Sequence, residues 1–280
     1  MPVNQPLQLS PTEETLLVPL FARAAESRRK RGILKDPKAL EMVAGIPWDY
    51  ERINQRWRLR GVVMRTAMFD EWVRAFLQRN PEGTVVEIGT GLNTRFERLD
   101  NGKVHWFDLD LPAVIELRRR YFSDSERRTM LAASIIDSNW IETVRRSPGP
   151  YFFVAETVLI YLQQQEVKTA LARIADCFPD MSVAFDTATH RAIIHGNRDF
   201  VRRKMDARFT WACDHPKEIE EWNIGLRLVE SLGFTDVPDP LRSRLSAPAR
   251  ARILLLNKLP PKIKYVYRLN LFSGTPKLDG

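Results

Sequence analysis

Cysteine is scarce in this chain: its 280 residues include only Cys177 and Cys213. Two cysteines can make neither a disulfide framework nor a cysteine-based zinc site, so we expect reduced structural thiols and no metal centre. Apolar runs long enough to cross a bilayer are also missing, and residues 1–17 lack the basic start and apolar segment of a secretory signal. These absences predict a cytoplasmic protein without a membrane partner.

Acidic residues are outnumbered by basic ones, 35 against 43, which gives a formal net charge of +8. Such an excess can indicate a nucleic-acid partner. However, no nucleic-acid motif accompanies it, and the densest basic run, residues 28–31, lies at an expected helix end where cations interact favourably with the helix dipole. We therefore expect solvated helix faces and no nucleic-acid partner, and the sequence predicts no particular oligomeric state.

The chain changes character near residue 80. Apolar residues at helical spacing predict helices over 11–31 and 62–79, and Asp36-Pro37 is typical of the start of another short helix. Further on, β-branched and aromatic segments alternate with helical ones, which is typical of a parallel sheet covered on both faces. We expect strands at 84–89, 103–110, 129–135, from 151 and at 181–187, helices from 112, at 164–177 and at 225–234, an irregular insertion at 188–222, and a last strand at the sheet edge over 265–272.

A turn with two glycines follows the first expected strand. Gly89 and Gly91 would let the backbone turn sharply and come close to a ligand. Asp108 and Asp110 end the second expected strand, about 20 residues beyond the first glycine, where an acidic side chain can hold the hydroxyls of a ribose. Two ligands fit this pair of features, a dinucleotide and S-adenosylmethionine, and a purely structural tight turn is the alternative.

Three details favour the methyl donor. Thr94 stands where the dinucleotide fingerprint has its third glycine. Glu87 lies just before the glycines, where a carboxylate suits a cationic ligand and would repel a pyrophosphate. Glu156 follows the fourth expected strand, so it should reach the same carboxyl edge of the sheet, where open α/β sheets bind ligands.

Four blocks of sequence resemble a known family in their order and spacing. They are VVEIGTGLNTRFERLD, WFDLDLPAVIELRR, AASIIDSNW and VAETVLIYL, and the likeness extends to LFARAAESR and MRTAMFD upstream and to YRLNLF downstream. Together they resemble the leucine carboxyl methyltransferase-like family, in its branch of polyketide-synthesis O-methyltransferases (tetracenomycin carboxyl methyltransferase-like). The resemblance covers nearly the whole chain.

The family's fold is therefore the expectation for this chain. It is α/β, the Rossmann-like fold of class I S-adenosylmethionine-dependent methyltransferases, with a mostly parallel seven-stranded sheet and a helical cap. The resemblance implies an N-terminal helical cap over residues 1–80 and a methyltransferase domain over 81–280, with a cap insertion at about 188–222.

The resemblance also implies a set of cofactor contacts. The glycine turn with Glu87 should face the methionine part, Asp110 the ribose, and Ser134 with Ile135 the adenine. Arg65 should meet the cofactor carboxylate and Glu156 the amino end, while Arg23 stands where the family often has a basic residue. Each has a plainer alternative, since Arg65 could be a surface arginine of an amphipathic helix and Ser134 could simply end a strand.

The methyl acceptor is expected to be a small molecule with a carboxylate or a phenolic hydroxyl. A carboxylate needs no base, whereas a phenol would benefit from one, and His190 is the candidate because it follows the fifth expected strand. Tyr161, Arg191 and Trp211 are candidate contacts for a planar, anionic, polyketide-like or aromatic substrate, although a surface helix with a small apolar anchor explains the last two equally well.

Four other functions stay open at this stage. An NAD(P)-dependent oxidoreductase would share the sheet and the acidic strand end, and a nucleic-acid methyltransferase would explain the charge. A protein C-terminal carboxyl methyltransferase belongs to the same parent family, and a regulator that binds the cofactor without catalysis would keep the same site. Because this fold does not itself set the substrate, the choice among them rests on the site.

Overall fold

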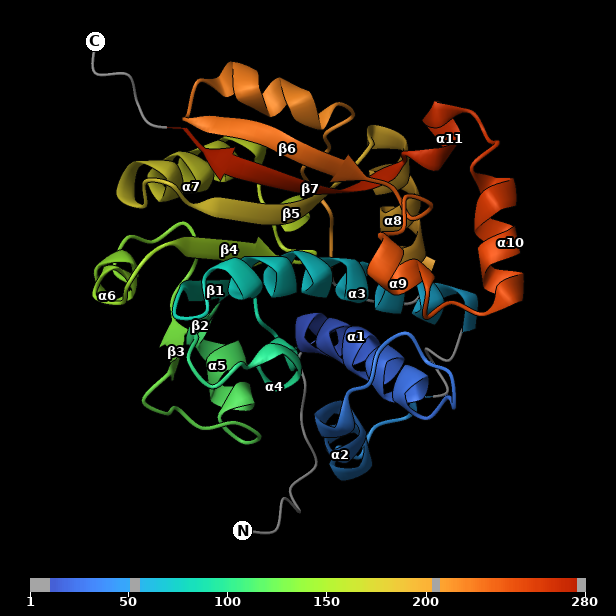
Figure 1. Ribbon diagram of the computed structural model, residues 1–280, viewed down its shortest axis with the longest axis horizontal. Coiled ribbons are helices and arrows are strands. Elements are labelled where there is room, and N and C mark those ends of the chain that lie inside the picture. The colour runs from blue at the N-terminus through green and yellow to red at the C-terminus, as the bar shows by residue number, and fades with distance from the viewer. Residues whose placement is uncertain (1–10, 51–55, 203–206, 276–280) are drawn as a thin grey trace.

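A twisted seven-stranded sheet forms the centre of the computed structural model, which describes residues 11–50, 56–202 and 207–275 (Figure 1). The strand order is β3-β2-β1-β4-β5-β7-β6. Strands β1 to β5 are parallel, whereas β7 runs antiparallel to both β5 and β6. The strands are β1 (Thr84–Ile88), β2 (His105–Asp110), β3 (Arg128–Ala132), β4 (Tyr151–Ala155), β5 (Ser182–Ala188), β6 (Leu226–Leu232) and β7 (Tyr267–Gly274).

The strand order reverses between β1 and β4, because β1 is followed towards one edge by β2 and β3 and towards the other by β4 and β5. In open α/β sheets the loops at such a reversal diverge and leave a crevice at the carboxyl ends of the strands. The fold thus places a ligand crevice next to the glycine turn. It is the mostly parallel, class I methyltransferase-type sheet that the sequence predicts.

Helices cover both faces of the sheet. They are α1 (Pro11–Ser27), α2 (Pro37–Gly45), α3 (Arg56–Arg79), α4 (Arg95–Leu99), α5 (Pro112–Arg118), α6 (Ile141–Arg145), α7 (Gln164–Cys177), α8 (His190–Arg202), α9 (Asp239–Arg242), α10 (Ala247–Leu256) and α11 (Pro261–Lys264). Two short 3-10 turns, Leu159–Tyr161 and Pro216–Trp222, complete the described elements. In this part of the chain no helix has the length and apolar character to cross a bilayer.

Alternate residues of the central strands enter two different cores, which explains their continuous apolar sequence. Val85 of β1 and Phe152 of β4 pack with α1, α2 and α3, where the Phe76 and Phe152 ring centroids lie 5.3 Å apart. Val86 and Phe153, one residue further along each strand, pack with α6 and α7 on the other face. Helices α1–α3 therefore share one continuous core with the sheet.

Helix α2 begins where its sequence signals predict. The Asp36 side chain accepts a hydrogen bond from the Ala39 backbone N–H at 2.9 Å. Pro37 occupies the first turn, where a backbone N–H makes no hydrogen bond within the helix, so a proline is tolerated there. Asp36 is fully buried, so this cap has charged partners as well, which are described with the site below.

The C-terminal part of the sheet differs from the prediction in two ways. Residues 225–234, predicted as a helix, form strand β6, and its register shifts between Leu228 and Glu230. That irregularity breaks the two-residue period, so the apolar residues of β6 imitate helical spacing. The final strand β7 was predicted at the sheet edge, but it lies between β5 and β6, and β6 forms the edge.

The predicted insertion at 188–222 is more regular than expected. It contains α8 and the 3-10 turn Pro216–Trp222 instead of irregular chain throughout. The polar and aromatic composition of the segment did not indicate a helix, because one face of α8 is exposed to solvent. Even Ile194 on this helix is 53% exposed. The other predicted strands and helices are confirmed, with ends that differ by a few residues.

Candidate functional site

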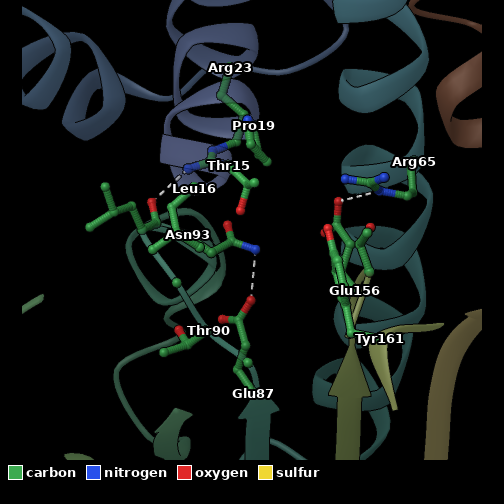
Figure 2. Close-up of a pocket in the computed structure, with 14 residues that line it drawn as sticks. Thr15, Leu16, Pro19, Arg23, Arg65, Glu87, Thr90, Asn93, Glu156 and Tyr161 are labelled. Carbon is green, nitrogen blue, oxygen red and sulfur yellow. Dashed lines mark hydrogen bonds and ion pairs between the residues drawn. The ribbon is translucent and has the colours of Figure 1, made fainter. Parts of the chain in front are cut away.

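A cavity lies at the carboxyl ends of β1 and β4, at the reversal of strand order (Figure 2). Figure 2 shows Glu87 and Asn93 on one side of it, and Arg65, Glu156 and Tyr161 on the other. Helix α1 closes it from above with Leu16, Pro19 and Arg23. The remaining lining residues are Thr15, Gly89, Thr90, Gly91, Leu92 and Thr157.

The glycine turn has a backbone that other residues adopt only with strain. Gly89 and Gly91 have φ values of +60° and +49°, in the left-handed region. A Cβ atom on Gly89 would lie only 2.3 Å from Cγ2 of Val158, so a side chain has no room there. The Gly91 N–H donates to the Asp110 carboxylate at 2.7 Å, which joins the turn to the end of β2.

Glu156 extends from the end of β4 into the cavity and is held by three donors. Arg65 Nε and Thr66 Oγ1, both on α3, donate to its Oε1 at 2.8 and 2.7 Å, and Arg95 Nη2 donates to its Oε2 at 2.5 Å. Burial raises the pKa of Glu156, but the two guanidinium groups outweigh that effect and lower it to about 2. The carboxylate therefore stays ionised at any ordinary pH.

The turn after Glu156 is fixed by Asp186, which lies in the second half of β5. Thr157 has a φ of +59°, and its backbone N–H donates to the two Asp186 carboxylate oxygens at 2.9 and 3.0 Å. The Tyr267 hydroxyl of β7 donates to the same carboxylate. These bonds hold a strained residue in place and so fix the direction of Glu156.

Arg95 of α4 connects three carboxylates that come from three different elements. Its Nε donates to Asp70 of α3 at 2.8 Å, its Nη1 pairs with Glu87 of β1, and its Nη2 pairs with Glu156. Its side chain has no solvent exposure. The sequence prediction missed Arg95, although it stands in the quoted GLNTRFERLD block, because an arginine in a short helix ordinarily faces solvent.

Of the two glutamates that line the cavity, Glu87 has the less complete set of hydrogen-bond partners. Its Oε1 accepts from Asn93 Nδ2 at 2.7 Å and from Arg95, whereas its Oε2 is buried without a hydrogen-bond partner. Burial raises the pKa of Glu87 to about 7, against the opposing effect of Arg95. An unsatisfied buried carboxylate oxygen at a cavity wall is a site for a cation or a hydrogen-bond donor.

This shifted pKa predicts a pH-dependent stability. Between pH 4.5, the ordinary pKa, and about 7, the folded chain binds more protons at Glu87 than the unfolded chain does. The contribution of Glu87 to the free energy of unfolding must therefore fall as pH rises through this window. We expect Glu87→Gln to gain stability relative to wild type between pH 5 and pH 7 in urea unfolding, while Glu142→Gln, altered at a 70% exposed side chain, tracks wild type. Parallel curves for all three proteins would contradict the assignment.

Arg23 reaches the site from α1 and ties that helix to the glycine turn. Its Nε pairs with Asp36 at 2.9 Å, and its Nη2 donates to the Leu92 carbonyl at 2.7 Å. Asp36 also accepts from the Thr94 hydroxyl and from Arg98 Nη1 at 3.3 Å. Arg23 thus lines the cavity as predicted, and its described bonds go to the protein itself.

The two aspartates of β2 have different environments. Asp108 is fully buried and accepts from Thr90 Oγ1 and Arg118 Nη2 at 3.0 Å and from Arg128 Nε at 2.7 Å, so its role is structural. Asp110 ends the strand and accepts only backbone N–H groups, those of Gly91 and Leu111. Each Asp110 oxygen keeps a lone pair for a further donor, which fits the predicted ribose contact.

Ser134 and Ile135 follow β3 directly beside Asp110, because Ala132 pairs with Asp110 and the Ala133 N–H donates to the Asp110 carbonyl at 2.9 Å. The Ser134 N–H donates to Asp137 Oδ2 at 2.9 Å, and Ile135 is buried. The structure therefore brings the residues predicted for ribose and adenine together at the carboxyl ends of β2 and β3, next to the glycine turn.

Of the residues predicted for catalysis or for the acceptor, three do not line the cavity, and neither do the ribose and adenine residues described above. The His190 side chain is 75% exposed, and its Nδ1 lies 2.6 Å from Asp214 Oδ2, so the insertion turns it towards solvent. Arg191 beside it is also exposed. Trp211 is buried in the core against Phe185 and Trp222, because its apolar ring packs under the insertion. Tyr161 does line the cavity.

Comparisons with known proteins identify the family of the chain. The family model described as leucine carboxyl methyltransferase matches residues 17–175. The chain is 30% identical over 269 residues to the tetracenomycin polyketide synthesis O-methyltransferase TcmP of Streptomyces glaucescens, covering 95% of this chain and 98% of that protein. It is 29% identical to the S-adenosyl-L-methionine-dependent methyltransferase dpfgK of Gibberella zeae, over 80% of this chain and 83% of that one.

Among solved structures, a DUF574 family protein from Streptomyces avermitilis has the same fold, with a TM-score of 0.60 and 14% identity over 95% of this chain and 100% of that one. The resemblance read from the sequence is thereby confirmed. The chain belongs to the leucine carboxyl methyltransferase family, and the activity that this family and these relatives indicate is methyl transfer that depends on S-adenosylmethionine.

Proposed function

We propose that this protein is an O-methyltransferase whose acceptor is a small, polyketide-like or aromatic molecule with a carboxylate or a phenolic hydroxyl. The observation that carries the proposal is the cavity in which the glycine turn faces the ionised Glu156 and its partner Arg65. The name of TcmP supports the acceptor class, because that relative spans nearly the whole chain. The missing third glycine argues against a dinucleotide and hence against an oxidoreductase.

The residues present fit S-adenosylmethionine. The unpartnered Glu87 Oε2 offers an acceptor for a cationic group. Glycine at position 89 lets the turn pack against Val158 beside the cavity, where a Cβ would clash. Asp110 would hold the ribose, Ser134 and Ile135 would flank the adenine, and Arg65 would meet the cofactor carboxylate. When bound, the cofactor supplies a methyl group activated on a positively charged sulfur.

The protein's own contribution would be to align the acceptor oxygen and to exclude water. Helix α1 supports this role, since Leu16 and Pro19 close the cavity opposite the sheet. We propose on this basis that residues 1–80 act as the cap of the domain formed by residues 81–280. Insertion 188–222 would complete the cap through Phe209, whose ring centroid lies 5.0 Å from that of Tyr161.

Tyr161 is the acceptor-side residue with the clearest support. Burial raises the pKa of Tyr161 to about 12, so its hydroxyl stays protonated and can donate to an anionic acceptor without serving as a base. A carboxylate acceptor needs no base, and this favours a carboxylate over a phenol. The proposed catalytic role of His190 would require α8 to turn its exposed side chain inward.

Both cysteines are free, which suits a reducing compartment, and we place the protein in the cytoplasm. We propose no nucleic-acid partner, because no nucleic-acid motif accompanies the positive charge.

A methyl-transfer screen tests the acceptor class. Purified protein would be supplied with S-adenosylmethionine carrying a labelled methyl group and with three panels: aromatic polyketide acids, phenols, and peptides ending in a leucine carboxylate. We expect label in the aromatic acids as base-labile esters. Transfer only to the peptides would replace this proposal with protein carboxyl methylation, and the absence of transfer to any panel would contradict it.

Removal of the Glu156 charge should weaken cofactor binding. Because hydrogen bonds to charged groups contribute about 1.5–3 kcal/mol, we expect Glu156→Gln to raise the Kd for S-adenosylmethionine by about 10- to 100-fold. Calorimetry measures the change, with Glu142→Gln as the matched control on an exposed side chain. Unchanged affinity in Glu156→Gln would show that this carboxylate takes no part in the site.

A further inference from the structure

The charged side chains around the cavity form one connected, buried network whose charges do not cancel. Within the described residues, each member pairs with another at no more than 4.0 Å, and no member has a side chain more than 11% exposed. The network contains five carboxylates and four guanidinium groups: Asp36, Asp70, Glu87, Glu156 and Asp186, with Arg23, Arg65, Arg95 and Arg98. Fully ionised, it carries one excess negative charge.

One carboxylate of the network, Glu87, has an incomplete set of hydrogen bonds. In each of the other four carboxylates both oxygens accept hydrogen bonds, as with Glu156 from Arg65 and Arg95, and Asp70 from Arg95 and Arg98. Asp36 bonds through Oδ1 to Ala39 and through Oδ2 to Arg23, and Asp186 bonds through both oxygens to Thr157. Only Glu87 has an oxygen left without a partner, and Glu87 lines the cavity.

The substrate and the product of methyl transfer differ by one unit of charge. S-Adenosylmethionine has a sulfonium, an ammonium and a carboxylate, which sum to +1, whereas its demethylated product has a neutral thioether and sums to zero. In the transfer, the carbon–sulfur bond breaks with its electron pair staying on sulfur, and the acceptor oxygen forms the new bond to the methyl carbon. The sulfonium charge therefore disappears during each turnover, and the negative charge of a carboxylate acceptor disappears with it as the neutral ester forms, so the bound cofactor alone changes from +1 to zero.

We propose that Glu87 makes the site selective for charge, so that the protein binds the sulfonium donor more tightly than the thioether product. The inference rests on the proposed function. A network with one excess negative charge is neutralised by the donor and is left uncompensated by the product, and buried uncompensated charge is costly. Once the sulfonium is lost and the neutral ester has left, Glu87 takes up a proton from solvent, and the site no longer has the additional affinity that it has for the donor.

The groups that face Glu87 support a coupled proton. Arg95 and Arg98 of α4 and Arg118 of α5 lower its pKa, whereas burial and Asp108 of β2 raise it, with a result of about 7. Glu87 is thus partly protonated near neutral pH when no cation is bound. Binding of a cation must displace that proton, and binding of a neutral thioether leaves it in place.

Calorimetry of the wild-type protein tests the proposal directly. S-Adenosylmethionine and its demethylated product are each titrated at pH 7 in phosphate and in Tris, whose heats of ionisation differ, so that the protons released are counted. We expect the donor to release about half a proton more than the product, and to bind about tenfold more tightly or better. The ammonium and carboxylate common to both ligands cancel in this comparison.

The Glu87→Gln variant should abolish the difference in proton release, weaken donor binding about tenfold, and change product binding less than about threefold. Glu142→Gln should behave as wild type. If both ligands bind wild type with equal proton release, the charge selectivity is wrong and the proposed function stands. If neither ligand binds, the proposed function itself falls. Because the wild-type comparison needs no variant, a folding defect in Glu87→Gln would not decide the result.

Discussion

Replacement of Arg95 by leucine is expected to lower the free energy of unfolding by about 3–5 kcal/mol. The guanidinium has no solvent exposure and contacts Asp70, Glu87 and Glu156 through its three nitrogens. Its removal leaves these largely buried carboxylates without their shared counter-charge. Urea denaturation at pH 7 measures the loss. The slope of the free energy of unfolding against urea concentration should stay unchanged if the native state keeps its compactness.

The matched control for this experiment is Arg146→Leu. Arg146 has a 76% exposed side chain and lies 4.0 Å from Glu142 on the surface, where ion pairs contribute little. We expect this variant to unfold at the wild-type urea concentration. If Arg95→Leu and Arg146→Leu were equally stable, the buried network would not support the site in the way described.

Replacement of Gly89 by alanine should reduce kcat/KM by about 100-fold, because misplacing a positioning group by about 1 Å can cost that much. The new Cβ would lie 2.3 Å from Val158 Cγ2, and valine has no flexible end with which to avoid it. The left-handed φ of +60° adds a strain of about 1–2 kcal/mol. The turn must therefore shift, and the cavity wall shifts with it.

Gly102→Ala provides the control for strain alone. Gly102 has a φ of +80°, but a Cβ there would meet no atom within 4 Å. We expect Gly102→Ala to lose about the same 1–2 kcal/mol of stability to backbone strain and to keep full activity. Adding Val158→Ala to Gly89→Ala should restore part of the activity by making room. Equal activity of Gly89→Ala and Gly102→Ala would mean that the close approach at Gly89 is unimportant.

The sequence predicted which residues meet at the carboxyl edge of the sheet, because those signals are local. A glycine pair after a strand and acids at the ends of neighbouring strands meet at one edge of any parallel sheet, whatever the details of packing. Glu87, Gly89, Gly91 and Glu156 accordingly lie together at the cavity. The single-residue roles assigned to them remain predictions until a ligand is bound.

The prediction failed where long-range packing decides the outcome. Arg95 lies in a helix of five residues, too short for a period that would mark its buried face, and two of its three partners lie 25 and 61 residues away in the sequence. Trp211 has a sequence context that suits a cavity wall as well as a core, and packing against Phe185 put it in the core. Strand β6 was predicted as a helix because its register shift interrupts the alternation of apolar and polar residues that marks a strand.

The most direct test of the account is a crystal structure of the protein with S-adenosylmethionine or its demethylated product. We predict that the methionine end of the ligand lies between the glycine turn and Glu156, with the ribose hydroxyls on Asp110. A ligand bound elsewhere, with Glu87 and Glu156 touching only protein atoms, would contradict the account.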